Sequence, residues 1–160
     1  MLDKLQGRNG SGEFARRSMK NLQFVLDVGA GADVHPVTQT ISALLGIVVF
    51  PWEKSAFRAV KTKRLAVARS EGWPPWTMSG PRVDSNKVKT IGNLLKLLRD
   101  SVAHGNVTFD SDSKVSSEVN VTFENYPKGS DKADWQASIR ADQLALFCQK
   151  FSAFVEDFVG

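Results

Sequence analysis

The feature that most constrains the fold of this chain is an amphipathic segment near its middle, NKVKTIGNLLKLLRDSVAHG, which runs from Asn86 to Gly105. Its apolar residues recur at spacings of three and four positions, the repeat of one buried face of an α-helix. Those residues are Val88, Ile91, Leu95, Leu98 and Val102. Ser85 or Asp84 can cap the first turn, and Gly105 suits the left-handed backbone that follows many helix ends. The sequence therefore predicts a helix over residues 86–105 with one buried face.

Two polar residues near the end of this segment, Arg99 and His104, are candidates for a functional site. At roughly 100° per residue, Arg99 lies about 60° from the centre of the apolar stripe, beside the small residues Gly92 and Ala103. An arginine at such a half-buried border needs an anionic or carbonyl partner. His104 lies in the last turn, where the helix dipole favours the protonated imidazole. The two residues are roughly 140° apart around the axis and ~7.5 Å apart along it. A long arginine side chain and a loosened last turn could bring them to one anion, and a second copy of the helix could do so better.

The string from Arg99 to His104 resembles the R-x(4-6)-H motif of the HEPN superfamily. The wider string LLKLLRDSVAHGNV is similar to the HEPN-family nuclease version, in which a helix ending in AHG runs into a β-hairpin. The stretch from Val37 to Lys54 is similar to the second helix of that subgroup, and the similar parts extend from Phe24 to Phe158. The resemblance implies a mainly α fold, namely a HEPN-like helical bundle with a small antiparallel β-hairpin or sheet before the C-terminal helix.

Hydrophobic periodicity along the rest of the chain predicts the other elements. Helices are expected over residues 13–28, 37–50, 52–70 and 140–159, and alternating strands over residues 106–109, 118–126 and 135–139. The stretch 37–50 is apolar almost all round, so it should be the central helix. A loop over residues 72–82 carries Trp73 and Trp76, which could stack on bases or close the bundle with their rings.

Domain organisation is expected to be simple. Residues 1–12 are polar and glycine-rich, and they should form a flexible lead-in that could be a cloning remnant. Residues 13–160 should form a single domain, since 160 residues are the size of one ordinary domain.

Composition limits the compartment and the cofactors. The formal net charge of +4 is compatible with a polyanionic partner such as RNA. Cys148 is the single cysteine and lies on an apolar helix face, which favours a core thiol in a reducing compartment. Two histidines and one cysteine make no credible zinc site, so neither a metal nor another cofactor is expected. No signal peptide is visible, and the longest apolar run, Ile41 to Phe50, is too short to cross a bilayer, so we expect a cytoplasmic protein without a membrane partner.

The resemblance also implies a function. It implies a homodimer in which two motifs face each other and, in active members, metal-independent endoribonuclease activity. In such a site His104 of each subunit would act as base or acid, and Arg99 would stabilise charge at the phosphate. Asp100 would orient Arg99 or His104, or would be a surface partner of Lys96. Lys89, Lys96 and Asn106 would line the approach of the RNA strand.

Two other readings stay open at this point. One is a non-catalytic HEPN domain that binds RNA, a nucleotide or a protein partner, and the other is a helical interaction module in which the motif is accidental. The family suggests a role in host defence, as a toxin, or in stress response. Toxin members of the superfamily that are inactivated by adenylylation carry Tyr two places beyond the His. This chain has Asn106 at that position, and the sequence therefore does not support control by adenylylation. A protein antitoxin is a hypothesis.

Overall fold

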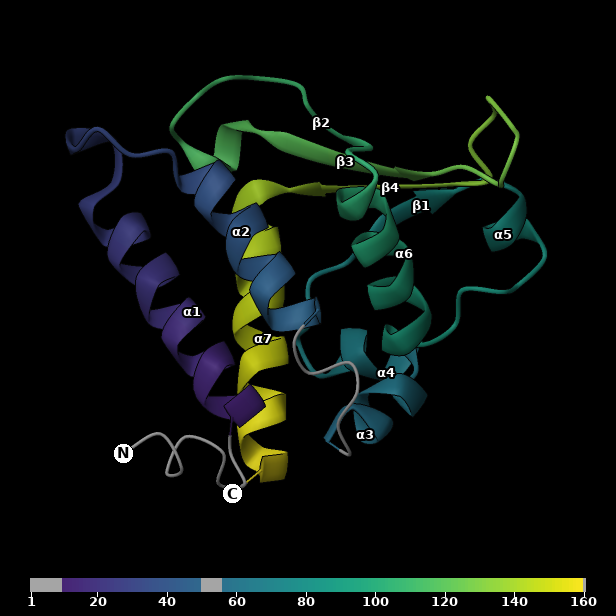
Figure 1. Ribbon diagram of the computed structural model, residues 1–160, viewed down its shortest axis with the longest axis horizontal. Helices are drawn as coiled ribbons and strands as arrows, with labels where there is room; N and C mark the ends of the chain where they lie inside the picture. Colours follow the sequence, from purple (N-terminus) through teal and green to yellow (C-terminus); the bar gives the residue numbers. More distant parts are fainter. Residues whose placement is uncertain (1–9, 50–55, 160) are drawn as a thin grey trace.

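The computed structural model describes residues 10–49 and 56–159 and confirms a mainly helical fold with a small antiparallel sheet (Figure 1). The helices are α1 (Gly10–Val28), α2 (Pro36–Val49), α3 (Ala56–Thr62), α4 (Leu65–Ser70), α5 (Pro81–Asp84), α6 (Ile91–Ala103) and α7 (Ala141–Val159). The strands are β1 (Thr77–Ser79), β2 (Val107–Phe109), β3 (Asn120–Asn125) and β4 (Trp135–Arg140). Short 3-10 turns, η2 (Gly29–Gly31) and η3 (Ser116–Glu118), complete the described elements.

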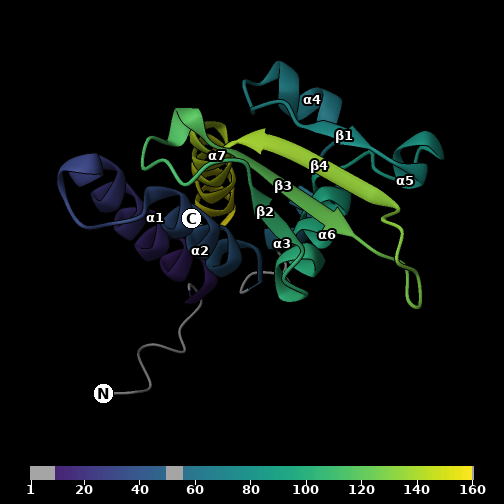
Figure 2. The same cartoon turned by 90° about the horizontal axis from the view of Figure 1, so that it is seen from above.

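The sheet has the order β1-β4-β3-β2 and lies across one end of the helices (Figures 1 and 2). All of its pairs are antiparallel, with Val121 opposite Ile139 in the central pair β3–β4. Alternate residues of these two strands are buried, as expected for strands with one face on a core. The three predicted strands are therefore confirmed, and β1 is an additional strand inside the predicted loop 72–82.

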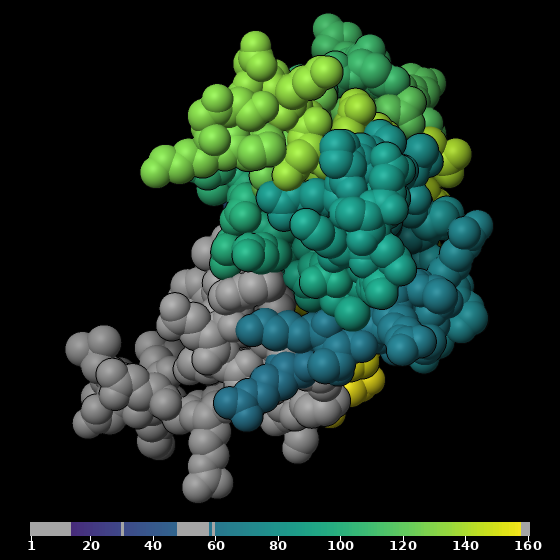
Figure 3. All heavy atoms as spheres, turned by 90° about the vertical axis from the view of Figure 1, so that its right-hand side faces the viewer, coloured from purple at the N-terminus to yellow at the C-terminus, as the bar shows by residue number. Residues whose placement is uncertain are grey.

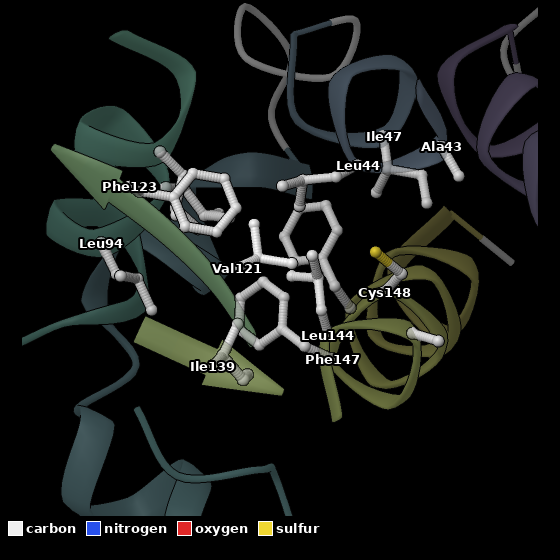
Figure 4. Close-up of a cluster of buried hydrophobic side chains, with 14 of the residues drawn as sticks. Ala43, Leu44, Ile47, Leu94, Val121, Phe123, Ile139, Leu144, Phe147 and Cys148 are labelled. Carbon is white, nitrogen blue, oxygen red and sulfur yellow. The ribbon is translucent and has the colours of Figure 1, made fainter. Parts of the chain in front are cut away.

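The core lies where the sheet meets α2, α6 and α7 (Figure 4). Phe147 and Phe151 of α7 face inward and are essentially inaccessible to solvent. Cys148 lies among them with no exposed surface, and this burial raises the pKa of its thiol to about 12. The side chain is thus a core thiol, as the sequence predicts.

The tryptophans of the 72–82 segment pack into this core. Trp73 is buried and meets Phe147 edge-on at a centroid distance of 5.6 Å. Trp76 contacts the same ring at 5.3 Å and the Phe123 ring of β3 at 5.9 Å. The two contacts with Phe147 are edge-to-face, the arrangement that aromatic quadrupoles favour, and the two tryptophan rings close the bundle.

The single helix predicted over residues 52–70 is wrong, because two helices are present in its described portion. The helix is interrupted between α3 and α4, where Arg64 forms an isolated antiparallel bridge with Thr90. The Leu65 N–H donates to the Lys89 carbonyl at 2.9 Å, and the Ile91 N–H donates to the Lys63 carbonyl at 2.8 Å. These sheet-like bonds take backbone groups away from a continuous helix and anchor the start of α6. The beginning of the predicted helix lies outside the described residues.

The predicted start of the helix over residues 86–105 is also wrong. Asn86 has a φ of +60°, a left-handed conformation that a helix cannot continue from. The cap is Thr90, whose hydroxyl accepts from the Asn93 N–H, while the Asn93 side chain accepts from the Thr90 N–H. This reciprocal pair is a capping box, so α6 begins at Ile91 and Ser85 and Asp84 belong to the end of α5 and its connection.

None of the helices in the described part of the chain combines the length and the apolar character needed to span a bilayer.

Candidate functional site

The C-terminal end of α6 has the geometry that the sequence predicts. Gly105 follows the helix with a φ of +70°, which glycine adopts without the Cβ penalty of other residues. Its N–H donates to the Val102 carbonyl at 3.1 Å, and the Asn106 N–H donates to the Ser101 carbonyl at 2.8 Å. These two bonds form a Schellman motif. Both ends of the His104–Asn106 segment are therefore held by backbone bonds rather than left as a free loop.

The sheet holds this segment from the other side. The Asn106 carbonyl accepts from the Glu124 N–H of β3 at 3.0 Å, and β2 begins at the next residue. His104 is the capping residue between helix and strand, and its side chain is exposed. A rigid backbone is a suitable support for an exposed imidazole that takes part in a reaction.

A cavity of ≈610 Å³ opens beside this helix end. It is lined by Asp100, His104, Asn106, Asn125, Tyr126 and Lys128. Figure 3 shows the lighter green β3–β4 connection overhanging the C-terminal end of α6. The helix end thus contributes three predicted site residues to one concave surface, and the connection after β3 contributes the opposite wall.

Arg99 is joined to this cavity through its neighbour. Its side chain is half-buried, with 29% of its surface exposed, as expected for the border of the apolar stripe. Its Nη2 and Nε donate to Asp100 Oδ1 at 3.1 and 3.3 Å. Of the partners suggested for Asp100 from the sequence, the structure therefore pairs it with Arg99.

The small neighbours of Arg99 have different environments. Gly92 is buried, and a Cβ on it would come within 2.7 Å of the Lys61 Cα, so it allows α3 to approach α6 closely. Ala103 is exposed beside the helix end. The space that the missing side chain of Gly92 leaves is therefore filled by the backbone of α3.

The predicted RNA-binding residues do not all gather at the cavity. Asn106 lines it, whereas Lys96 and Lys89 do not. At 1.5 Å per residue, Lys96 lies ~12 Å from His104 along the helix, and Lys89, which precedes the cap, lies roughly 20 Å away. Both side chains are exposed.

Three cavity residues were missed from the sequence: Asn125, Tyr126 and Lys128. Asn125 is the last residue of β3, and Tyr126 and Lys128 follow it. The pairing of Val107 with Phe123 brings the end of β3 beside the start of β2. The Tyr126 hydroxyl donates to Glu124 Oε2 at 2.7 Å, and this bond to a carboxylate raises the pKa of the phenol. Alternation in EVNVTFENY indicates a strand, and its antiparallel pairing with β2 places its C-terminal end beside the motif.

Within the described residues, no group of three or more His, Cys, Asp or Glu side chains is placed to hold a metal ion. The other histidine, His35, lines a different cavity near the start of α2.

Comparison with known families gives a match that covers nearly all of the chain. The family described as HEPN pEK499 p136 matches residues 5–160, which is nearly the whole chain. No match was found among curated proteins or among solved structures. The family match, the bundle with its small sheet, and the Arg99–His104 motif at the end of α6 agree, and the chain belongs to the HEPN family.

Proposed function

We propose that the protein is a metal-independent endoribonuclease, with a role in host defence, as a toxin or in stress response. One observation carries the proposal: the exposed side chain of His104, held at a fixed helix end, lines a cavity large enough for a nucleotide. Asp100, which also lines that cavity, holds the guanidinium of Arg99. An imidazole at an open cavity and an arginine held by a carboxylate of the same cavity are groups suited to phosphodiester cleavage.

The reaction we propose uses the RNA's own 2′-hydroxyl. The 2′-oxygen attacks the adjacent phosphorus, the bond from phosphorus to the 5′-oxygen breaks, and a 2′,3′-cyclic phosphate and a 5′-hydroxyl result. One imidazole accepts the proton of the 2′-hydroxyl, and another donates a proton to the leaving 5′-oxygen. Arg99 stabilises the negative charge that accumulates on the phosphate oxygens.

This scheme needs two imidazoles, and the cavity at the end of α6 has only that of His104 within the described residues. Within the described residues the other histidine, His35, lies at a different cavity, so a second copy of the chain is the natural source of the missing group. A homodimer that brings His104 of each subunit to one phosphate supplies base and acid together. The family resemblance supports the same arrangement.

Asp100 would keep Arg99 in position before RNA binds. The pair is partly exposed, with 29% and 33% of the two side chains accessible. Ion pairs at such positions contribute only ~0–1 kcal/mol, so a phosphate can compete with Asp100 for the guanidinium at little cost.

The experiment is cleavage of single-stranded RNA in EDTA by purified protein. We expect products that end in 2′,3′-cyclic phosphate, and we expect His104→Ala and Arg99→Ala to lose cutting. Because His104 is exposed and its backbone makes the capping bond, His104→Ala should unfold at the temperature of the wild type. RNA binding without cleavage by the wild type would instead indicate a non-catalytic binding domain.

Lys128 gives a further test, since it lines the cavity opposite the helix end. If it contacts the RNA phosphate, Lys128→Gln should lower kcat/KM about tenfold or more, because hydrogen bonds to charged groups contribute about 1.5–3 kcal/mol. Lys132→Gln is the matched control, because Lys132 lies in the same connection and is exposed but does not line the cavity. Equal effects of the two substitutions would show that only overall charge matters.

A further inference from the structure

A second cavity, of ≈570 Å³, lies at the other end of β2. One wall is the start of α2, residues 35–38, and the other is the end of β2 with the loop that follows it, residues 109–114. Neither the predicted motif nor the proposed reaction uses any of these residues. Phe109 lies at this cavity with 47% of its surface exposed, so its ring is accessible to a ligand.

β2 connects this cavity with the proposed catalytic one. Asn106, just before β2, lines the first cavity, and Phe109, its last residue, lines the second. At ~3.3 Å per residue these positions are ~10 Å apart, a distance that a few nucleotides of single-stranded RNA can cover. β2 is an edge strand of the sheet, so one of its sides is not paired with a strand in the described part of the chain.

The hydrogen-bond pattern of β2 leaves backbone groups available on that side. The Glu124 N–H donates to the Asn106 carbonyl, and the Asp110 N–H donates to the Asn120 carbonyl. In an antiparallel pair the bonded positions alternate, so the amides of the odd positions, Val107 and Phe109, face the free edge. Such amides can donate to phosphate oxygens.

The side chains of the second cavity are of the kinds that bind a nucleotide. Lys114 and His35 are its basic residues, and Phe109 offers an aromatic face. Lys114 lies 3.8 Å from Asp33, whose side chain is fully exposed, so this long pair is screened by solvent and leaves the ammonium able to bind a phosphate.

The two aspartates of this cavity do not prevent such binding. Asp110 already accepts from the backbone N–H and the side-chain amide of Asn120, both at 2.7 Å. Asp112 is exposed on the loop, and a carboxylate there can accept from the exocyclic amino group of a base.

We infer that this second cavity holds a nucleotide of single-stranded RNA that flanks the scissile phosphate, with its base stacked on Phe109 and its phosphate near Lys114. The RNA runs along the free edge of β2 between the two cavities. The inference rests on the proposed function, because the path begins at His104.

The test uses the His104→Ala protein, which cannot cut, and a short fluorescein-labelled single-stranded RNA. Adding Phe109→Ala should weaken binding about fivefold or more, the usual effect of removing one stacking ring. The matched control is Phe24→Ala in the same background, because Phe24 is also an exposed phenylalanine, at 66%, and lies on α1 away from both cavities. Lys114→Gln should weaken binding further and make it less dependent on salt.

The possible results separate this inference from the proposed activity. If the protein with His104 intact cuts RNA and Phe109→Ala binds like Phe24→Ala, the second cavity is not an RNA site, although the nuclease stands. If Phe109→Ala weakens binding but the protein with His104 intact does not cut, the RNA site stands without the nuclease. If RNA is neither bound nor cut, both proposals fail. If Phe109→Ala disrupts a dimer and leaves RNA affinity unchanged, the edge of β2 binds a second copy and the inference is overturned.

Discussion

Removal of the Thr90 hydroxyl tests how α6 is held in place. The Thr90 Oγ1 accepts from the Asn93 N–H at 3.1 Å, and the Asn93 Oδ1 accepts from the Thr90 N–H at 3.1 Å. Loss of a capping hydroxyl costs about 1 kcal/mol, with a range of about 0.5–2. For a domain of this size each kcal/mol lowers the melting temperature by roughly 2–4 °C. We therefore expect Thr90→Ala to melt a few degrees below the wild type.

Thermal and urea unfolding followed by circular dichroism measure this effect, and two further variants define its origin. Thr90→Ser keeps the accepting oxygen and should restore most of the stability. Ser85→Ala is the matched control, because the Ser85 hydroxyl makes only a long bond of 3.4 Å to the Arg82 carbonyl. Its cost should stay within about 0.5 kcal/mol. If Ser85→Ala costs as much as Thr90→Ala, or Thr90→Ala costs nothing, the assignment of the cap is wrong.

Three other substitutions probe packing, the helix end and the core. Gly105→Ala should lower the free energy of unfolding by about 1 kcal/mol through the left-handed backbone alone, since an added Cβ meets nothing within 4 Å. It should also reduce RNA cutting, because a shift of this backbone displaces His104. Gly92→Ala should destabilise by about 1–3 kcal/mol, because its Cβ would collide with the Lys61 backbone, whereas Gly31→Ala, in open space, should be close to neutral; unfolding measurements compare them. Cys148, whose pKa is raised to about 12, should resist a thiol reagent in the folded protein at neutral pH and react on unfolding; rapid reaction under native conditions would show that it is accessible.

The same raised pKa predicts a dependence of stability on pH. The folded state favours the neutral thiol, so its contribution is fully present below the unfolded pKa near 9 and is lost as pH rises toward about 12. Cys148→Ala should flatten this part of the stability profile, when the wild type and the variant are unfolded in urea across that range. An unchanged slope would contradict the assigned burial.

The two ends of α6 show what the sequence could and could not predict. The C-terminal end depends on local chemistry, because a glycine at position 105 suits the left-handed backbone that closes the helix. The N-terminal end has a local capping box, Thr90 with Asn93, and also a bridge between Thr90 and Arg64, a pairing that local sequence does not show. The apolar spacing extends back to Val88 and masks the true start, since a side chain before a helix can also pack against the core.

The candidate site divides in the same way. Arg99, Asp100, His104 and Asn106 are close in sequence, and helix geometry is enough to relate them. Its other wall comes from the end of β3 and the residues after it, which no local pattern marks and which the antiparallel pairing with β2 brings beside the motif. Lys89 and Lys96 have the right charge, but their distance along the axis from His104 separates them from the cavity.

The most direct test of a catalytic site shared between two subunits is a crystal structure of the protein with bound RNA. The scissile 2′-hydroxyl of this RNA is methylated, so that it cannot attack. We expect a homodimer in which the two His104 side chains approach one phosphate from opposite sides, with Arg99 on its oxygens. Two His104 side chains that point away from each other, or an RNA bound elsewhere with both cavities empty, would contradict it.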